Sequence, residues 1–122
     1  MGSFWKDLPK PFLVLAPMDD VTDNAFREVV ASCARPDVFF TEFVSADGLV
    51  SEGFEKVARK LKYEPHQHPI VAQLWGKNPD NFYASAKIIQ KLDEKFYLDR
   101  FLLKDEKFFL TNKKGDVYTS LI

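Results

Sequence analysis

Two polar side chains interrupt otherwise apolar runs of this sequence, and both are candidates for chemistry. Glu42 lies within the run 38–44, and Gln73 lies within the run 70–75. A carboxylate in such a run must be paired or lie at the open end of its strand. A buried amide needs a hydrogen-bond partner and offers both a donor and an acceptor. Gln73 is therefore either a ligand-binding group or an amide that satisfies a loop backbone.

A third candidate is Ala16-Pro17-Met18, which follows the apolar run 12–16. Pro17 has no N–H and cannot continue a central strand, so it exposes backbone at the strand end. Met18 adds a soft apolar surface, and the combination suits packing on a flat ring. The alternative is a plain turn. In α/β proteins, ligands bind at the carboxyl ends of such strands.

The other reactive side chains favour structural roles. His66 and His68 form an H-x-H pair without a third ligand at a suitable spacing, so solvated loop histidines are favoured over a metal site. Cys33 is the only cysteine, which excludes an intrachain disulfide and fits a reducing cytoplasm. Its place in a helical repeat predicts a buried packing role.

Three alternations of strand and helix are predicted before residue 92. Strands are expected at 12–16, 38–44 and 70–75, and a 3.6-residue periodicity follows each run. Strands that alternate with helices are joined in parallel by right-handed crossovers. The predicted fold class is therefore α/β with a parallel sheet.

Capping signals and apolar repeats define the helices. Thr22 or Asp23 caps the first helix, and Asn78-Pro79 begins the third. The expected inner face of the first helix consists of residues at helical spacing, namely Phe26, Val29, Val30 and Cys33.

The pattern changes after residue 92. Three short strands are predicted at 96–103, 107–112 and 117–122, with turns at 104–106 and 113–116. This is typical of a β-meander rather than a fourth strand–helix unit. The expected division is residues 1–92 as one part and 93–122 as a divergent, β-rich tail.

The length and the net charge of the chain limit the folds and functions that it can have. The chain has 122 residues, whereas a complete (β/α)₈ barrel needs about 250. Its 17 basic and 18 acidic side chains nearly cancel, so net charge gives no argument for nucleic acid. No leader is recognised and no apolar run approaches the ~18 residues of a membrane span. A soluble, cytoplasmic protein is expected.

Three stretches together resemble the tRNA-dihydrouridine synthases, a family of flavin-dependent TIM barrels. The first joins Ala16-Pro17-Met18 to Val21-Thr22-Asp23 and Phe26-Arg27. Two later stretches agree in order and spacing, namely 40–46 and 69–76. The resemblance covers roughly residues 12–92, which would be the first three strand–helix units of the barrel.

The resemblance implies an oxidoreductase that reduces a uridine of tRNA to 5,6-dihydrouridine, with FMN as cofactor and NADPH as reductant. It makes tRNA the expected partner. The implied cofactor-binding residues are Pro17, Met18 and Asp19, whose backbone would lie along the flavin ring, and Gln73, which would hydrogen-bond it. Asp19-Asp20 departs from the small residues often found there, and two carboxylates would oppose the anionic reduced flavin.

The resemblance also implies what this chain lacks. The fourth strand of the family ends in Asn-x-Gly-Cys-Pro, whose cysteine donates a proton to the uracil ring, and no such sequence is present. No catalytic residue and no metal ligand is therefore expected here. The later phosphate-binding loops of the barrel are also missing, so the chain is expected to be truncated and inactive alone.

Two alternatives remain open. One is a small non-catalytic α/β protein derived from the same barrel. The other is a fragment of a different flavin-dependent barrel, such as a dihydroorotate dehydrogenase, although Thr22-Asp23 and Phe26-Arg27 argue against it.

Overall fold

The computed structural model describes residues 4–92, 97–104, 107–111 and 117–119. Its elements, in chain order, are η1 (Phe4–Lys6), α1 (Asn24–Cys33), β1 (Phe39–Ser45), α2 (Ala46–Leu49), α3 (Phe54–Ala58), η2 (Arg59–Leu61), η3 (Pro65–Gln67), β2 (Ile70–Gly76), α4 (Pro79–Leu92), β3 (Tyr97–Lys104), β4 (Lys107–Thr111) and β5 (Val117–Thr119).

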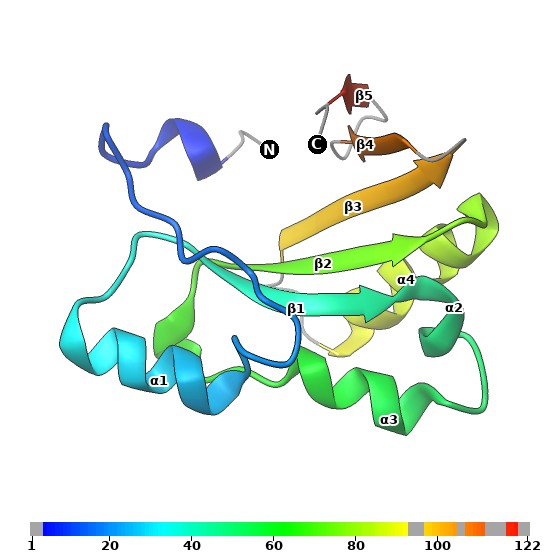
Figure 1. Ribbon diagram of the computed structural model, residues 1–122, viewed down its shortest axis with the longest axis horizontal. Coiled ribbons are helices and arrows are strands. Elements are labelled where there is room, and N and C mark those ends of the chain that lie inside the picture. Colours follow the sequence, from blue (N-terminus) through cyan, green and yellow to red (C-terminus); the bar gives the residue numbers. More distant parts are fainter. Residues whose placement is uncertain (1–3, 93–96, 105–106, 112–116, 120–122) are drawn as a thin grey trace.

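The strands form one five-stranded sheet in the order β1-β2-β3-β4-β5. The first three strands are parallel, and β4 and β5 continue antiparallel. Figure 1 shows β1, β2 and β3 running in the same direction, with α1 and α3 below the sheet as drawn and α4 behind it. This is an α/β fold with a parallel sheet, as expected for part of a TIM barrel, and β1 and β2 confirm two predicted strands.

The tail contributes more to the parallel sheet than predicted. β3 pairs in parallel with β2 over six residue pairs, from Val71↔Tyr97 to Gly76↔Leu102. Helix α4 is thus a crossover between parallel strands. The three predicted tail strands agree with β3, β4 and β5, which pair antiparallel in sequence order as a meander does, but the parallel pairing of β3 with β2 was not predicted. The predicted turns at 104–106 and 113–116 lie mostly outside the described residues.

The strand predicted at 12–16 does not form. This segment makes one isolated parallel bridge, Val14↔Val38, with the Leu15 N–H donating to the Val38 carbonyl at 3.2 Å. The Leu13 carbonyl accepts from the N–H groups of both Asp37 and Val38, which is not the regular pattern of a parallel ladder. Pro11 and Pro17, which have no N–H to donate, flank the segment.

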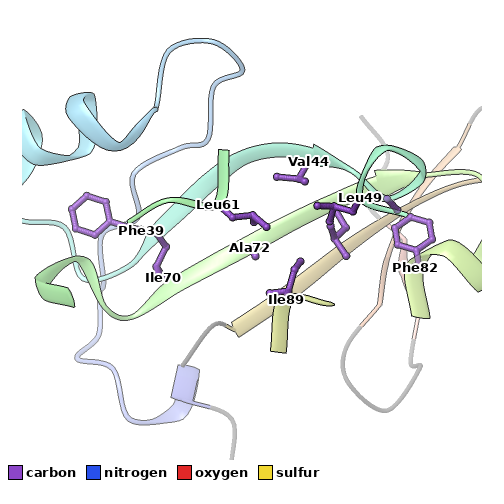
Figure 2. Packing of buried hydrophobic residues seen from close by; sticks show 10 residues of the cluster. Phe39, Val44, Leu49, Leu61, Ile70, Ala72, Phe82 and Ile89 are labelled. Carbon is purple, nitrogen blue, oxygen red and sulfur yellow. The ribbon is translucent and has the colours of Figure 1, made fainter. Parts of the chain in front are cut away.

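One face of the sheet carries the apolar core. Ile70, Ala72 and Leu74 alternate along β2 and pack against Phe82 and Ile89 of α4 (Figure 2). This alternation is the period of two of a strand, so the intervening residues of β2 face the opposite side. In a barrel that opposite side is the interior, toward the ligand.

Helix α1 begins as predicted but presents a different face to the core. Asp23 caps it, since its carboxylate accepts from the Phe26 N–H at 2.8 Å. Phe26 and Val29 are exposed, and so is Cys33, so the predicted apolar inner face was wrong. The buried residue is Arg27.

The physical reason is a polar inner face. The residues of α1 that are buried or half-buried at helical spacing include Asn24, Arg27, Glu28 and Ala31. They meet the buried Gln67 of η3, whose amide donates to Asn24 at 3.0 Å and to Glu28, and accepts from Arg27 at 3.0 Å. A paired polar face is buried here in place of an apolar one.

Helix α4 begins as predicted. Asn78 Oδ1 accepts from the Asp80 N–H at 2.9 Å, and Pro79 is the first helical residue. Within the described part of the chain, none of the helices has the length and apolar character needed to cross a membrane.

Candidate functional site

The segment 17–22 forms a tight corner, named here the 17–22 corner. The Thr22 hydroxyl closes it, accepting from the Met18 N–H at 3.0 Å and donating to the Met18 carbonyl at 3.1 Å. The backbone N–H groups of Val21 and Thr22 also donate to that carbonyl. Asp20 has a φ of 57°, a left-handed conformation that Asp tolerates better than most side chains. The Thr-Asp motif thus shapes the corner and then caps α1.

Glu42 anchors this corner to β1. Its side chain is only 4% exposed, and its Oε1 accepts from the Asp20 N–H at 2.7 Å. Glu42 is the central residue of β1, at an irregularity between Phe40 and Phe43 where the pairing register with β2 shifts. The sequence predicted a paired carboxylate or one at the open strand end; the structure shows neither among the described residues, and a backbone hydrogen bond satisfies the carboxylate instead.

Gln73 lies on the neighbouring strand. It is registered with Phe43, the residue after Glu42, and is 3% exposed. Its backbone N–H donates to the Thr41 hydroxyl at 3.2 Å. Its side-chain Oε1, however, has no hydrogen-bond partner within the described part of the chain. A buried acceptor left without a partner costs about 1–3 kcal/mol, so it marks a place where a ligand donor fits.

The candidate residues therefore come from the 17–22 corner and from the middle of β2, and both lie beside the middle of β1. Pro17 is half-buried, while Met18 is 41% exposed and Asp19 is exposed. The 17–22 corner contacts β1 at Glu42, and Gln73 is registered with the next residue of β1. An exposed apolar side chain and an unpartnered buried amide thus flank the same stretch of β1.

Lys60 compensates the acidic charge of the corner. Its Nζ lies 2.5 Å from Asp19 Oδ1 and 3.9 Å from Asp20 Oδ1, while oxygens of Asp19, Asp20 and Glu42 lie within 4.8 Å of one another. Burial on its own lowers the pKa of Lys60, but the hydrogen bond to Asp19 and the three carboxylates together raise it. The negative charge of these two carboxylates is therefore partly balanced by a cation. Lys60 is 41 residues from Asp19, and nothing in the sequence pointed to it.

Arg27 supports the corner from beneath. Its guanidinium donates to the Thr22 carbonyl and the Lys62 carbonyl at 2.6 Å each, and to Gln67 at 3.0 Å. Burial lowers the pKa of Arg27, and the carboxylates of Glu42, Asp23 and Glu28 oppose that shift. Its role within Phe26-Arg27 is to fix the framework.

Cys33 and His66 lie apart from this site. Cys33 ends α1, after which the chain turns into the start of β1, so it lies toward the amino ends of the strands (Figure 1). His66 Nε2 lies 2.8 Å from Glu28 Oε1 and joins the polar face of α1. Its predicted burial was wrong, since Cys33 is exposed.

Comparison with known proteins identifies relatives of this arrangement. A family model described as "Dihydrouridine synthase (Dus)" matches residues 14–95. A probable tRNA-dihydrouridine synthase of Staphylococcus aureus (strain N315) is 45% identical over 91 residues, which are 74% of this chain and 28% of that protein. Probable tRNA-dihydrouridine synthase 2 of Bacillus subtilis (strain 168) is 49% identical over 81 residues, 66% of this chain and 25% of its own length. The chain thus spans about a quarter of the length of these curated relatives.

Proposed function

The chain belongs to the dihydrouridine synthase family, and we propose that it provides the amino-terminal part of a flavin site in an oxidoreductase that converts a uridine of tRNA to 5,6-dihydrouridine. The single observation that carries the flavin assignment is the unpartnered, buried Oε1 of Gln73. It lies beside the stretch of β1 that the 17–22 corner contacts. The tRNA substrate rests on the names of the relatives.

The residues present fit FMN. A flavin ring carries N–H and carbonyl groups on one edge, and the Gln73 amide offers one acceptor and two donor hydrogens to such an edge. Pro17, Met18 and Asp19 would hold the ring through backbone atoms and the exposed Met18 side chain. When bound, FMN supplies the hydride that reduces the C5–C6 double bond of uridine, with NADPH as its reductant.

The residues of this chain would orient the ring and tune its surroundings. The Met18 side chain would exclude water from one side of it. Lys60 would keep the carboxylates of Asp19 and Asp20 from opposing negative charge there. The protein's contribution is thus position and electrostatics.

The proton donor for the uracil ring is not among the groups assigned to this chain. Cys33 is its only thiol and ends α1, away from Gln73. We therefore propose that the chain acts only together with the catalytic residues of a complete barrel, and that it does so in the cytoplasm. In this proposal residues 1–92 form the barrel part and residues 93–122 form a divergent tail.

The test is FMN binding followed by turnover. Titrating FMN fluorescence should show weak binding to the 122-residue chain, and Gln73→Leu should weaken it by about tenfold, the factor for one hydrogen bond of ~1.4 kcal/mol. Gln90→Leu, a matched change at an exposed glutamine of α4, should leave binding unchanged. Equal affinity for Gln73→Leu and the unaltered chain would remove Gln73 from the site.

The second assay measures NADPH-dependent dihydrouridine in unmodified tRNA. The chain alone should give no measurable product, because the loss of a positioned general acid costs about 10²–10⁴-fold in rate. Turnover by the chain alone would contradict this assignment of roles.

A second candidate function is a non-catalytic α/β protein. The observation that favours it is the pairing of β3 with β2, which fills the sheet edge beside the candidate site with a strand of the tail. A stably folded chain that binds no FMN at millimolar concentration would support this alternative.

A further inference from the structure

We propose that Glu42 is a positioning residue, whose buried carboxylate holds the backbone of the 17–22 corner in the conformation that receives the cofactor. This inference rests on the proposed flavin site and adds to it a residue that touches no ligand itself. Glu42 acts through the Asp20 N–H, at an Oε1–N distance of 2.7 Å.

The setting of Glu42 is unusual for a plain core residue. It is 4% exposed, and no described residue forms an ion pair with it within 4.0 Å. A buried carboxylate without a directly paired cation is costly to keep. Lys60 and Arg27 act on it only at longer range: the charge of Glu42 helps to raise the pKa of Lys60 and opposes the lowering of the pKa of Arg27 by burial.

What offsets that cost is the hydrogen bond to the corner. Hydrogen bonds from a backbone N–H to a carboxylate are shorter and stronger than neutral ones. The Asp20 N–H belongs to a residue with a φ of 57°, a conformation that needs support from its surroundings. Glu42 supplies that support from inside the sheet.

Three consecutive residues of the corner are therefore held by three different groups. Thr22 holds both backbone groups of Met18, Lys60 holds the side chain of Asp19, and Glu42 holds the N–H of Asp20. Of these hydrogen bonds and ion pairs, only the one to Glu42 connects the corner to β1. It thus sets where the backbone of 17–19 lies relative to β1 and its neighbour β2.

The first test measures amide hydrogen exchange at Asp20 by NMR. Glu42→Gln keeps an acceptor oxygen of the same reach, whereas Glu42→Leu keeps the volume and removes the acceptor. The Asp20 amide should exchange at a similar rate in the unaltered chain and Glu42→Gln, and at least about tenfold faster in Glu42→Leu.

Glu64→Leu is the matched control. Glu64 is a half-buried carboxylate that accepts from the Asn24 amide at 3.3 Å, on the polar face of α1 rather than at the corner. It should leave exchange at Asp20 unchanged. Unchanged exchange in Glu42→Leu, or equally fast exchange in Glu42→Gln, would overturn the positioning role, and so would an equal effect from Glu64→Leu.

The second test links the corner to the cofactor. FMN affinity should fall about tenfold in Glu42→Leu and be rescued in Glu42→Gln. If exchange at Asp20 increases but FMN affinity does not change, the corner does not serve the cofactor and the inference fails. If the unaltered chain binds no FMN, the proposed function fails. The inference then fails as well, because it rests on that function. This holds even if the exchange experiment shows that Glu42 fixes the corner.

Discussion

At the scale of single residues, buried polar groups determine this structure more than the apolar residues near them. Arg27 has no exposed surface, yet it follows Phe26 in a helix whose apolar repeat indicated the opposite face. A buried charge is stabilised when hydrogen-bond acceptors surround it. Each of the three guanidinium nitrogens of Arg27 donates to one acceptor, namely two backbone carbonyls and Gln67.

Arg27→Lys should therefore destabilise the chain strongly. An ammonium cannot reproduce the planar fork, so at least one buried carbonyl and Gln67 lose their donor, at about 1–3 kcal/mol for each unsatisfied group. We expect the free energy of unfolding, measured in urea, to fall by about 3 kcal/mol.

Arg35→Lys is the matched control. Arg35 also donates to three carbonyls, those of Pro36, His66 and His68, but it is exposed. Water replaces lost bonds there, and the expected loss is below about 1 kcal/mol. Equal losses for the two variants would show that the burial of Arg27 does not matter.

The ion pairs of Lys60 at the same corner should make the stability of the folded chain depend on pH. Its pKa is raised in the folded chain, so its contribution to stability is complete below the ordinary lysine pKa of about 10.4 and is lost as pH rises through the raised value. Because the partners Asp19 and Asp20 are exposed, water screens these ion pairs and the effect should be at most about 1 kcal/mol.

The measurement is the urea midpoint between about pH 8 and pH 11. Lys60→Met should lower the midpoint at pH 8 and flatten its fall above about pH 10. Lys56→Met, at an exposed lysine of α3, should leave that slope intact. An alkaline slope that is identical in Lys60→Met and the unaltered chain would contradict the assignment.

Residue types predicted part of the site. Gln73 and Glu42 were recognisable because each interrupts an apolar run, and both are buried. Lys60 and Gln67 were not recognisable, since their partners are 41 and 40 residues away. Long-range polar pairing leaves no local pattern, whereas burial in a strand does.

At the scale of elements, apolar periodicity predicted β1, β2 and α4 well, because each has a core on one side or both. It failed for 12–16, which makes only one isolated bridge among the described residues, and for the face of α1, where the buried side is polar. Helix α2 was not predicted either, since its four residues are too few to show a period.

The packing of α2 against α3 provides a prediction at Gly48. A Cβ built there would lie 2.7 Å from Val57 Cγ2, a stiff β-branched side chain. Gly48→Ala gains helix propensity, about 0.5–1 kcal/mol, but overpacking costs about 1–3 kcal/mol. We expect a net destabilisation of about 1 kcal/mol in thermal or urea unfolding.

The clash itself can be tested by a double-mutant cycle. Val57→Ala removes the opposing methyl group, so Gly48→Ala should become neutral or stabilising in that background. Gly53→Ala, where the nearest atom is Ser51 Oγ at 3.3 Å, should have a smaller effect than Gly48→Ala. A destabilisation that persists in the Val57→Ala background would show that backbone conformation, rather than packing, requires glycine at 48.

At the scale of the whole molecule, the sheet is asymmetric. Its β3 side is extended by β4 and β5, whereas the β1 side ends at the single bridge between Val14 and Val38. Leu13 is 71% exposed beside that bridge, and exposed large apolar side chains nearby in the sequence include Val14 and Val21. An open edge with exposed apolar residues is a site of association between chains.

Leu13→Glu should therefore reduce self-association of the chain. A carboxylate at this edge opposes strand pairing and makes the net charge more negative, from −1 to −2. Tyr83→Glu makes the same change of charge at an exposed aromatic of α4, away from the edge. Light scattering at increasing concentration should show a smaller apparent mass for Leu13→Glu than for Tyr83→Glu. The comparison separates the effect of the sheet edge from the effect of net charge, because only Leu13→Glu changes the edge. Equal apparent masses for the two variants would show that the edge beside β1 does not drive association.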